Sequence, residues 1–377
     1  MIKFLSEANK KNLSGVALLR LDFNTEDDWR MRAVLPTIRF LLRHSSKIVI
    51  ISHRGRPQPR LIRANGRIVG ANKKLSLRKD GLRLQKFLGR KIRFVPALNF
   101  AAIKKAVNQS LRGSIVLLEN LRFWKGEEAN DAKFAKNIAS LADYYVNDAF
   151  AVSHRANASV AAITKFLPSY AGFGLEKEIK ILGQVVRKPR HPLVFVIGGA
   201  KASDKLSVIK YFKSKADCFL LGGAAANTIL ALKGANMKKS LRDKNKKDLR
   251  KLRGILGYKN VLLPVDLKWQ SGVAFDIGPK TVRIFTNKIR RAKAIIWSGP
   301  VGFFEKSGFG AGNLAVARAI AENHKAFTLA GGGETVMFLK KHWLDKKFSF
   351  ISTGGGAMLE FLAGKKLPGI SALNKYG

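Results

Sequence analysis

Charged and amide side chains follow several apolar runs in the first half of this 377-residue chain. An arginine guanidinium presents a planar fork of donors, so it can bind a carboxylate or a phosphate through two hydrogen bonds. Several arginines at strand ends therefore indicate a binding site for a small anionic metabolite. The residues at these positions are Asp22, Asn24, the segment Ser52-His53-Arg54-Gly55-Arg56-Pro57, Arg122, and Arg155.

Two of these side chains have simpler interpretations. His53 taken alone favours a buried core histidine over a ligand contact. Arg122 could form a surface ion pair, which contributes about 0–1 kcal/mol. Its position just after an apolar strand makes that interpretation the weaker one.

In the second half of the chain, glycine follows the apolar runs. Glycine lets backbone N–H groups approach an anion closely, and the helix that follows adds a favourable dipole. Several such turns on one sheet edge indicate a large phosphate-bearing ligand, which we interpret as a nucleotide. The P-loop, dinucleotide and protein-kinase signatures are absent. The turns are Gly198-Gly199, Gly222-Gly223, Gly299, Gly331-Gly332-Gly333 and Gly354-Gly355-Gly356.

The apolar runs themselves predict the elements that position these residues. They lack polar alternation, as strands buried on both faces do. Stretches with helical periodicity, such as 314–324, separate most of them, so we predict parallel sheets with right-handed crossovers. The expected strands include 48–51, 115–118, 144–146, 193–197, 219–221, 261–265, 294–297, 327–330 and 348–351.

The length suits two domains of roughly 150 residues each. We expect an α/β protein with two Rossmann-like lobes, each a parallel sheet flanked by helices. The first lobe would span 1–170, a hinge helix 171–187, and the second lobe 188–353. Pro189 and Pro192 would end the hinge helix.

The composition is unusually basic. Seventy Lys and Arg against 25 Asp and Glu give a formal net charge of +45. Such a field attracts polyanions, including RNA. The densest run, 238–253, has nine basic residues and carries Leu241, Leu249 and Leu252 near helical spacing, so we predict an exposed amphipathic helix. No aromatic residue interleaves this run to stack bases, which weakens a nucleic-acid interpretation.

Several features favour a cytoplasmic protein. No apolar run approaches the ~18 residues that a membrane span needs. The first twelve residues lack a secretory signal pattern. Cys218 is the only cysteine, so it cannot form an internal disulfide, and its apolar neighbours predict a buried thiol.

Many segments across both halves resemble the phosphoglycerate kinase family, in the order in which the family has them. The similarity covers nearly the whole chain, and so many ordered segments are very specific. They are LDFN (21–24), WRMRAVLPTI (29–38), SHRGRP (52–57), LLENLRFWKGEE (117–128), YVNDAF (145–150), SHRANAS (153–159), AGFGLEKE (171–178), VIGGAKASDKLSVI (196–209), LLGGAAANT (220–228), DIGPKT (276–281), GPVGFFE (299–305), GGGET (331–335) and STGGGAMLEFLAGKKLPGISAL (352–373).

The resemblance implies a role for each matching position. It implies substrate contacts from Asp22, Asn24, Arg30, His53, Arg54, Gly55, Arg56, Arg122 and Arg155. It implies nucleotide contacts from Lys201, Lys205, Gly299, Glu305, Gly332, Gly333, Glu334 and Thr335, with Glu305 at the ribose. It assigns transfer of the phosphoryl group to Arg30, Lys201, Gly333 and Gly356, and it places the metal at Glu334.

The same resemblance implies a glycolytic and gluconeogenic transferase. ATP and 3-phosphoglycerate would be converted to ADP and 1,3-bisphosphoglycerate, with Mg²⁺ on the nucleotide. The family further implies a hinge-bending monomer that is not bound to a membrane. A carboxyl-terminal tail, here about 354–377, would pack back on the first lobe.

This reaction suits the residues. The nucleophile is a substrate carboxylate that is already ionised at neutral pH, so no general base is needed. Positive charge and alignment around the phosphoryl group are what the transition state requires. Closure of the lobes would align the substrates and protect the acyl phosphate from water.

Four positions depart from the family pattern. Glu334 stands where aspartate is usual, which would shift the metal by one methylene. Ser298 stands where asparagine is usual, Arg54 replaces an apolar residue, and the loop after Asn24 is short. We expect an active enzyme with altered nucleotide affinity.

Two other functions remain open. The chain could be a scaffold of the same fold that binds RNA or another polyanion, with catalysis weakened or lost. It could also be a kinase for another acidic metabolite, although that would require a different arginine pattern.

Overall fold

The computed structural model describes residues 1–58 and 70–376, which divide into two compact units. The first unit combines Met1–Lys180 with Lys366–Gly377, and the second is Ile181–Lys365. Each unit contains a six-stranded parallel sheet flanked by helices, so the expected α/β fold is confirmed. Helix α7 (Phe173–Arg187) contains the point where the chain passes from one unit to the other.

The sheet of the first unit has the strand order β3-β4-β2-β1-β5-β6. All its neighbouring strands pair in parallel. Since the strands are parallel, their carboxyl ends lie along one edge of the sheet. The strands are β1 (Val16–Arg20), β2 (Lys47–Ile51), β3 (Ile92–Val95), β4 (Ile115–Leu118), β5 (Tyr144–Asn147) and β6 (Ser169–Ala171).

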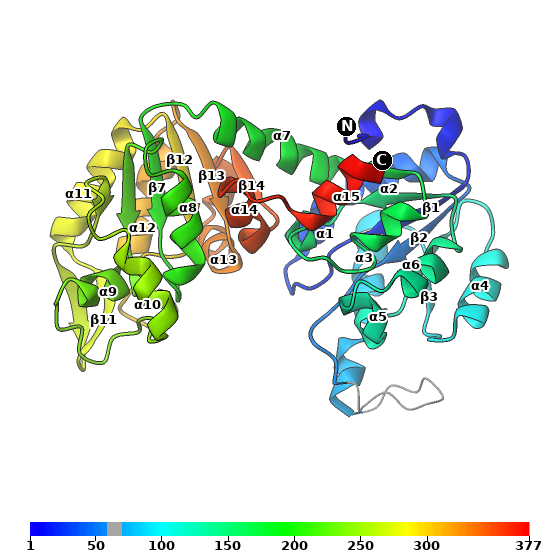
Figure 1. Cartoon of the computed structure of the whole chain (residues 1–377), viewed down its shortest axis with the longest axis horizontal. Helices are drawn as coiled ribbons and strands as arrows, with labels where there is room; N and C mark the ends of the chain where they lie inside the picture. Colours follow the sequence, from blue (N-terminus) through cyan, green and yellow to red (C-terminus); the bar gives the residue numbers. More distant parts are fainter. Residues whose placement is uncertain (59–69, 377) are drawn as a thin grey trace. The chain divides into compact units, whose positions relative to one another are not determined.

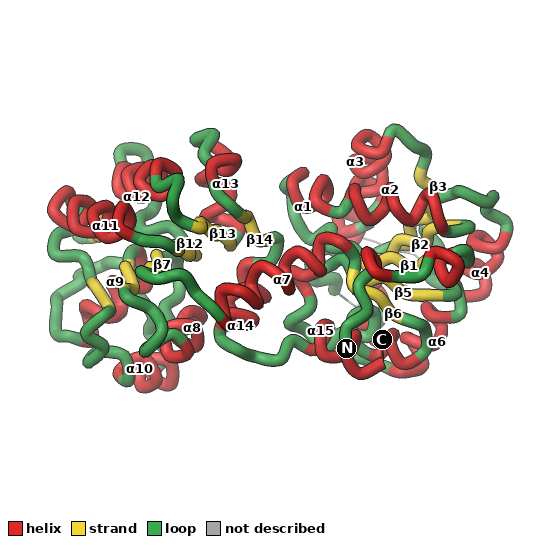
Figure 2. The backbone as a smooth tube through the Cα atoms, turned by 90° about the horizontal axis from the view of Figure 1, so that it is seen from above, coloured by secondary structure: helices red, strands yellow, loops and turns green. Residues whose placement is uncertain are grey.

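Helices cover both faces of this sheet. Figure 2 shows α2 and α3 on one side of it and α6 and α15 on the other. Leu35, Ile38 and Leu41 recur every three residues along α2 and are buried in the core. The helices are α1 (Asp28–Ala33), α2 (Leu35–His44), α3 (Arg78–Leu88), α4 (Phe100–Asn108), α5 (Lys125–Glu128), α6 (Ala132–Ala139) and α15 (Pro368–Tyr376).

The second unit repeats the design with the order β14-β13-β12-β7-β8-β9. Its strands also pair in parallel. Trp297 is fully buried on the central strand β12, and its indole N–H donates to the carbonyl of Gly299 at 2.9 Å. The strands are β7 (Leu193–Ile197), β8 (Cys218–Leu221), β9 (Val261–Leu262), β12 (Ala294–Ser298), β13 (Phe327–Gly331) and β14 (Phe350–Ser352).

Figure 2 shows α11, α12 and α13 on one face of this second sheet, with α8, α9, α10 and α14 on the other. A separate antiparallel pair joins β10 (Leu267–Gln270) to β11 (Val273–Ile277). The helices are α8 (Leu206–Tyr211), α9 (Gly223–Leu232), α10 (Lys246–Arg253), α11 (Pro279–Arg291), α12 (Ala311–Glu322), α13 (Gly333–Lys341) and α14 (Gly355–Leu362).

The strand expected over 348–351 instead runs over Phe350–Ser352, and two other elements are much shorter than predicted. The strand expected over 261–265 ends at Leu262, because Pro264 has no N–H to donate to a ladder. The helix expected over 238–253 begins only at Lys246. Asn245 caps it by accepting from the N–H groups of Lys247 and Asp248 at 2.9 and 3.2 Å.

The carboxyl-terminal segment is divided between the units. Helix α14 belongs to the second unit and packs against α8, whereas Lys366–Gly377 belongs to the first. In the first unit, the N–H of Gly369 donates to the carbonyl of Ser153 at 2.9 Å. The Cα of Gly369 also faces Val160 closely. Within residues 1–58 and 70–376, no helix combines the length and apolar character needed to cross a membrane.

Candidate active site

One candidate binding region lies in the first unit at the carboxyl ends of β1, β2 and β4, which we call the basic edge. Ser52 connects three loops there through hydrogen bonds. Its backbone carbonyl accepts from Leu121 N–H at 3.1 Å. Its hydroxyl accepts from Phe23 N–H at 3.0 Å and donates to the carbonyl of Leu21 at 2.7 Å. The loops after the three strands therefore form one connected surface.

Two asparagines fix the loop at residues 54–55. The side-chain oxygen of Asn120 accepts from the N–H groups of Arg54 and Arg122 at 3.2 and 3.1 Å. Its amide group donates to the carbonyls of Arg54 and Leu75 at 2.7 and 2.9 Å. Asn24 accepts from the N–H of Gly55 at 2.8 Å. In the structure, Asn24 therefore positions the loop that carries the expected substrate contacts.

His53 has an unusual environment. It is 2% exposed, and its Nδ1 lies 3.1 Å from Nη2 of Arg20. A guanidinium can only donate, so Nδ1 accepts and the proton is on Nε2. Among the described residues, that buried Nε2 has no hydrogen-bond partner. Burial lowers the pKa of His53 well below 6.5, and the charges of Arg20, Arg122 and Arg155 lower it further, so the imidazole is neutral at pH 7.

Arg20, which the sequence analysis did not identify, orients this histidine. It is 1% exposed, and its Nε donates to the hydroxyl of Ser159 at 2.9 Å. Glu127 accepts from the same hydroxyl at 2.6 Å and lies 3.9 Å from the guanidinium of Arg20. The charge of Arg20 is thus balanced inside the protein. The sequence signal that could have identified Arg20 is its charge at the end of an otherwise apolar strand.

The remaining cations of the basic edge are only partly neutralised. Arg30 on α1 lies 3.3 Å from Asp22. Arg122 donates to the carbonyl of Gly55 and lies 3.3 Å from Glu128, whose side chain is 63% exposed. Burial lowers the pKa of Arg122, and Glu128 opposes that shift. The Nε of Arg155 donates to His154 at 3.3 Å.

Arg54 and Arg56 are placed differently from these cations. The guanidinium of Arg54 points to α3, where its Nε and Nη2 donate to the two carboxylate oxygens of Asp80 at 2.9 and 2.8 Å. It also pairs with Glu26 at 2.5 Å. Hydrogen bonding to Asp80 raises the pKa of Arg54 above its usual value. Arg56 is exposed.

A separate candidate binding region lies in the second unit at the carboxyl ends of β7, β8, β12, β13 and β14, which we call the glycine edge. Here turns approach one another backbone to backbone. A side chain on Gly355 would place its Cβ 2.6 Å from the Cα of Gly332, so only glycine fits. Gly332 itself has a φ of +101°. The turns after β13 and β14, which carry Gly333 and Gly356, are thereby held together.

A hollow of about 250 Å³ opens at this edge. Phe303, which is 52% exposed, stacks on Phe275 with ring centroids 6.0 Å apart. Both rings belong to the lining, together with glycine backbone and two carboxylates. The lining consists of Gly199, Ala200, Gly223, Ala224, Asn227, Leu241, Val273, Ala274, Phe275, Pro300, Gly302, Phe303, Glu305 and Glu334. Aromatic walls beside glycine turns suit a base linked to phosphates. Phe275 and Phe303 are separated in sequence, and the sequence analysis did not identify them.

The expected phosphate contacts lie next to this hollow. A Cβ on Gly199 would be 3.6 Å from Nζ of Lys205 and 3.8 Å from Oε2 of Glu334. Burial lowers the pKa of Lys205, while Asp204 and Glu334 act in the opposite direction. Lys201 is exposed. Thr335 instead supports the backbone, because its hydroxyl accepts from the N–H of Gly299 at 2.8 Å.

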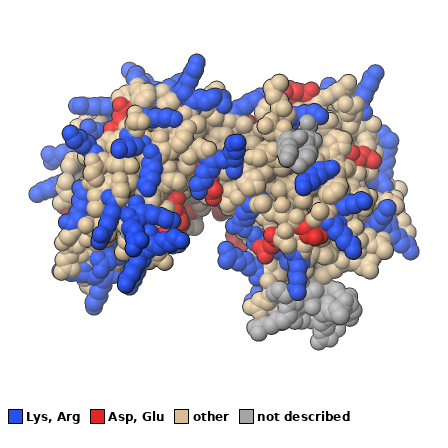
Figure 3. Space-filling model, in the orientation of Figure 1, with Lys and Arg blue, Asp and Glu red and all other residues tan. Residues whose placement is uncertain are grey.

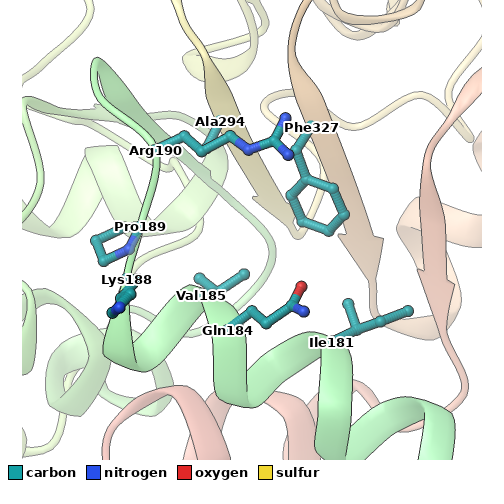
Figure 4. A pocket seen from close by; sticks show the side chains of 8 residues that line it. All are labelled: Ile181, Gln184, Val185, Lys188, Pro189, Arg190, Ala294 and Phe327. Carbon is teal, nitrogen blue, oxygen red and sulfur yellow. The ribbon is translucent and has the colours of Figure 1, made fainter.

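A second hollow in this unit lies away from the glycine edge. Figure 4 shows Ile181, Gln184 and Val185 pointing from α7 toward Phe327, the first residue of β13. This hollow of about 320 Å³ also borders Ala294, the first residue of β12. It therefore lies at the amino ends of the strands, opposite the glycine turns.

Comparisons with known proteins agree on one family. A family model described as phosphoglycerate kinase matches residues 14–365. The phosphoglycerate kinase of Dictyoglomus turgidum is 38% identical, with 98% of each chain covered. The chain belongs to the phosphoglycerate kinase family.

Further phosphoglycerate kinases support this assignment. That of Pelotomaculum thermopropionicum is 40% identical over 94% of this chain and 95% of its own. The solved phosphoglycerate kinase of Coxiella burnetii has a TM-score of 0.82 and 31% identity, covering 100% of this chain and 99% of its own. That of Pyrococcus horikoshii has a TM-score of 0.83 and 28% identity, covering 99% and 98%.

The glycine edge of this phosphoglycerate kinase family member suits a Mg²⁺ ion that is bound to the nucleotide. Within the described residues, no cluster of three or more His, Cys, Asp or Glu forms a ready-made metal site. Mg²⁺ typically takes one or two carboxylates, substrate phosphates and water. Glu334 offers one exposed carboxylate beside the glycine edge, in the first turn of α13. This donor set fits a metal that arrives with the nucleotide.

Proposed function

We propose that the chain catalyses reversible phosphoryl transfer between ATP and the carboxylate of 3-phosphoglycerate. The observation that carries the proposal is the environment of His53. Its buried Nε2–H has no partner among the described residues, and three arginines act on it electrostatically. A buried donor that lacks a partner costs free energy, which an oxygen of an anionic substrate would recover.

The basic edge would bind the acid and orient it. Neutral His53 would donate through Nε2, while Arg122, Arg155 and Arg56 would supply the charge. Asp22 would hold Arg30 in place, since the two side chains lie 3.3 Å apart. Because the substrate carboxylate is already ionised, none of these groups needs to remove a proton.

The glycine edge would bind the nucleotide. Phe275 and Phe303 would contact the base, and Glu305 would meet the ribose. Lys201, Lys205 and the backbone around Gly332, Gly333 and Gly356 would stabilise charge on the phosphates. Bound Mg²⁺, held through Glu334, would neutralise phosphate charge. Gly299 and Thr335 would support this backbone through their mutual hydrogen bond.

Arg54 would act indirectly. Its guanidinium is occupied by Asp80 and Glu26, so we propose that it positions the loop at residues 54–55, which would contact the substrate. The lobes 1–170 and 188–353 would each bind one substrate, and 171–187 would serve as the hinge that lets the substrates meet. We further propose a monomer that works in the cytoplasm.

A coupled assay tests the proposal directly. ATP-dependent formation of 1,3-bisphosphoglycerate, followed through glyceraldehyde-3-phosphate dehydrogenase and NADH, should show turnover that needs Mg²⁺. His53→Gln should raise the KM for 3-phosphoglycerate about tenfold or more. Phe303→Ala should raise the KM for ATP and leave that for the acid unchanged. No turnover with folded protein would favour the scaffold, and turnover only with another acid would favour a different kinase.

A further inference from the structure

The most basic segment of the chain forms an accessible surface in the second unit. It comprises residues 238–253 and ends in α10; with Trp269 on β10 we call it the α10 surface. Of its nine basic side chains, eight are exposed and Arg242 is partly exposed. Within the described residues none of them forms an ion pair. Figure 3 shows lysines and arginines gathered over this region.

The two acidic residues of the segment do little to offset this charge at the surface. Asp243 is buried, and its carboxylate accepts from the N–H of Ser203 at 2.9 Å. Asp248 lies in the first turn of α10, where its charge complements the helix dipole. The segment therefore presents a nearly uncompensated row of cations to solvent.

The fold brings an aromatic ring to this surface that the sequence order hides. The N–H of Lys239 donates to the carbonyl of Gly272 at 3.0 Å, and Ser240 accepts from the N–H of Ala274 at 2.9 Å. These bonds hold the start of the segment against the β10–β11 hairpin. Trp269 on β10 is 42% exposed, and Nζ of Lys238 lies 5.7 Å from its ring centroid.

Single-stranded nucleic acid binds where a row of cations contacts its phosphate backbone and an exposed aromatic ring stacks on its bases. A lipid bilayer would require an apolar helix face as well. Helix α10 lacks one, because Leu252 is buried in the protein and Leu249 is partly buried. Its solvent side is charged. In a duplex the bases are stacked on one another, so no base would be available to stack on Trp269.

We propose that the α10 surface binds single-stranded RNA. The phosphates would lie along Lys246, Lys247, Arg250 and Arg253, and a base would stack on Trp269. This binding does not depend on phosphoryl transfer, since none of these side chains lines the nucleotide hollow.

Fluorescence anisotropy with a labelled 20-nucleotide oligouridine, titrated from 50 to 300 mM KCl, tests the proposal. The variant Lys246→Gln/Lys247→Gln/Arg250→Gln/Arg253→Gln should weaken binding at least tenfold at 100 mM salt. It should also reduce the slope of log K against log salt by about 3, because single strands give about 0.7 per phosphate contact. Its kcat and KM values should not change, which shows that it folds.

The matched control removes the same charges from α11, with Lys280→Gln/Lys288→Gln/Arg290→Gln/Arg291→Gln. All four side chains are exposed, so binding should weaken less than threefold. Trp269→Ala should weaken RNA binding about 5- to 100-fold, while Trp269→Phe should retain most of it.

Four results would overturn the proposal. Equal losses in the α10 and α11 variants would mean that diffuse charge alone attracts RNA. Unchanged binding by Trp269→Ala would remove the single-strand argument, as would equal affinity for a 20-base-pair duplex. Stronger binding to phosphatidylserine vesicles than to oligouridine would identify a membrane surface.

Discussion

The pair formed by Arg54 and Asp80 should couple the loop at residues 54–55 to α3. Asp80 is a buried acid, with its side chain 1% exposed, and it receives both donors of the Arg54 fork. Arg83 gives weaker support, since its Nη1 lies 3.5 Å from the same carboxylate. Replacing Arg54 by leucine, an apolar residue of the kind usual in the family, would leave Asp80 with that single partner.

The size of the effect follows from burial. Removing one partner of a buried ion pair costs about 3–5 kcal/mol. Because Arg83 remains and the Arg54 side chain is 14% exposed, we expect Arg54→Leu to reduce local stability by about 2–3 kcal/mol. Glu26 also pairs with Arg54, but its side chain is 86% exposed. Glu26→Gln should therefore cost at most about 1 kcal/mol.

Hydrogen-exchange mass spectrometry of peptides from residues 52–58 and 78–88 is the suitable assay, because the two units need not unfold together. A double-mutant cycle of Arg54→Leu with Asp80→Asn should give a coupling energy of about 2 kcal/mol. The KM for 3-phosphoglycerate should rise in Arg54→Leu with little change in kcat. A coupling energy near zero, or equal losses from Arg54→Leu and Glu26→Gln, would refute the reasoning.

Three further changes have defined outcomes. Burial raises the pKa of Asp148 from 3.8 to about 6. Between these two pH values the native carboxyl keeps a proton that the unfolded chain has lost. The free energy of unfolding should therefore fall by about 3 kcal/mol as the pH rises from 3.8 to 6. Asp148→Asn should flatten that part of a urea-unfolding pH profile, and an unchanged slope would contradict it. The pKa of His53 is lowered in the folded protein, so the free energy of unfolding should fall as the pH drops below about 6.5. His53→Gln should remove that loss. The same loss in the variant would mean that the imidazole is charged in the native state. Glu334→Asp should change the Mg-ATP dissociation constant several-fold in calorimetry while the KM for 3-phosphoglycerate stays constant; identical nucleotide binding would show that the longer side chain is immaterial.

Patterns set by local chemistry were predictable from the sequence. Apolar runs without polar alternation predicted the parallel strands, such as β7 and β12. Charge or glycine at their ends predicted which side chains and turns lie along the basic edge and the glycine edge. Each of these signals depends on residues adjacent in the chain. The helix predicted over 238–253 was too long, because the cap at Asn245 outweighed the periodicity of the leucines.

What the sequence did not reveal depends on contacts across long separations. Arg20 reaches Ser159 and His53, which follow it by 139 and 33 positions. Phe275 and Phe303 become one wall of the hollow only after folding. Arg54 matched a substrate motif, yet its guanidinium is used by Asp80 on a later helix. The family motif identified the loop but not the direction of this side chain.

The first unit combines two segments that are far apart in the chain, Met1–Lys180 and Lys366–Gly377. During synthesis, all residues of the second unit are translated before Lys366–Gly377. Until that segment is translated, the first unit is incomplete, because Val160 and Ser153 lack their contacts with Gly369. The second unit can therefore complete its fold before the first, although most residues of the first unit are translated earlier.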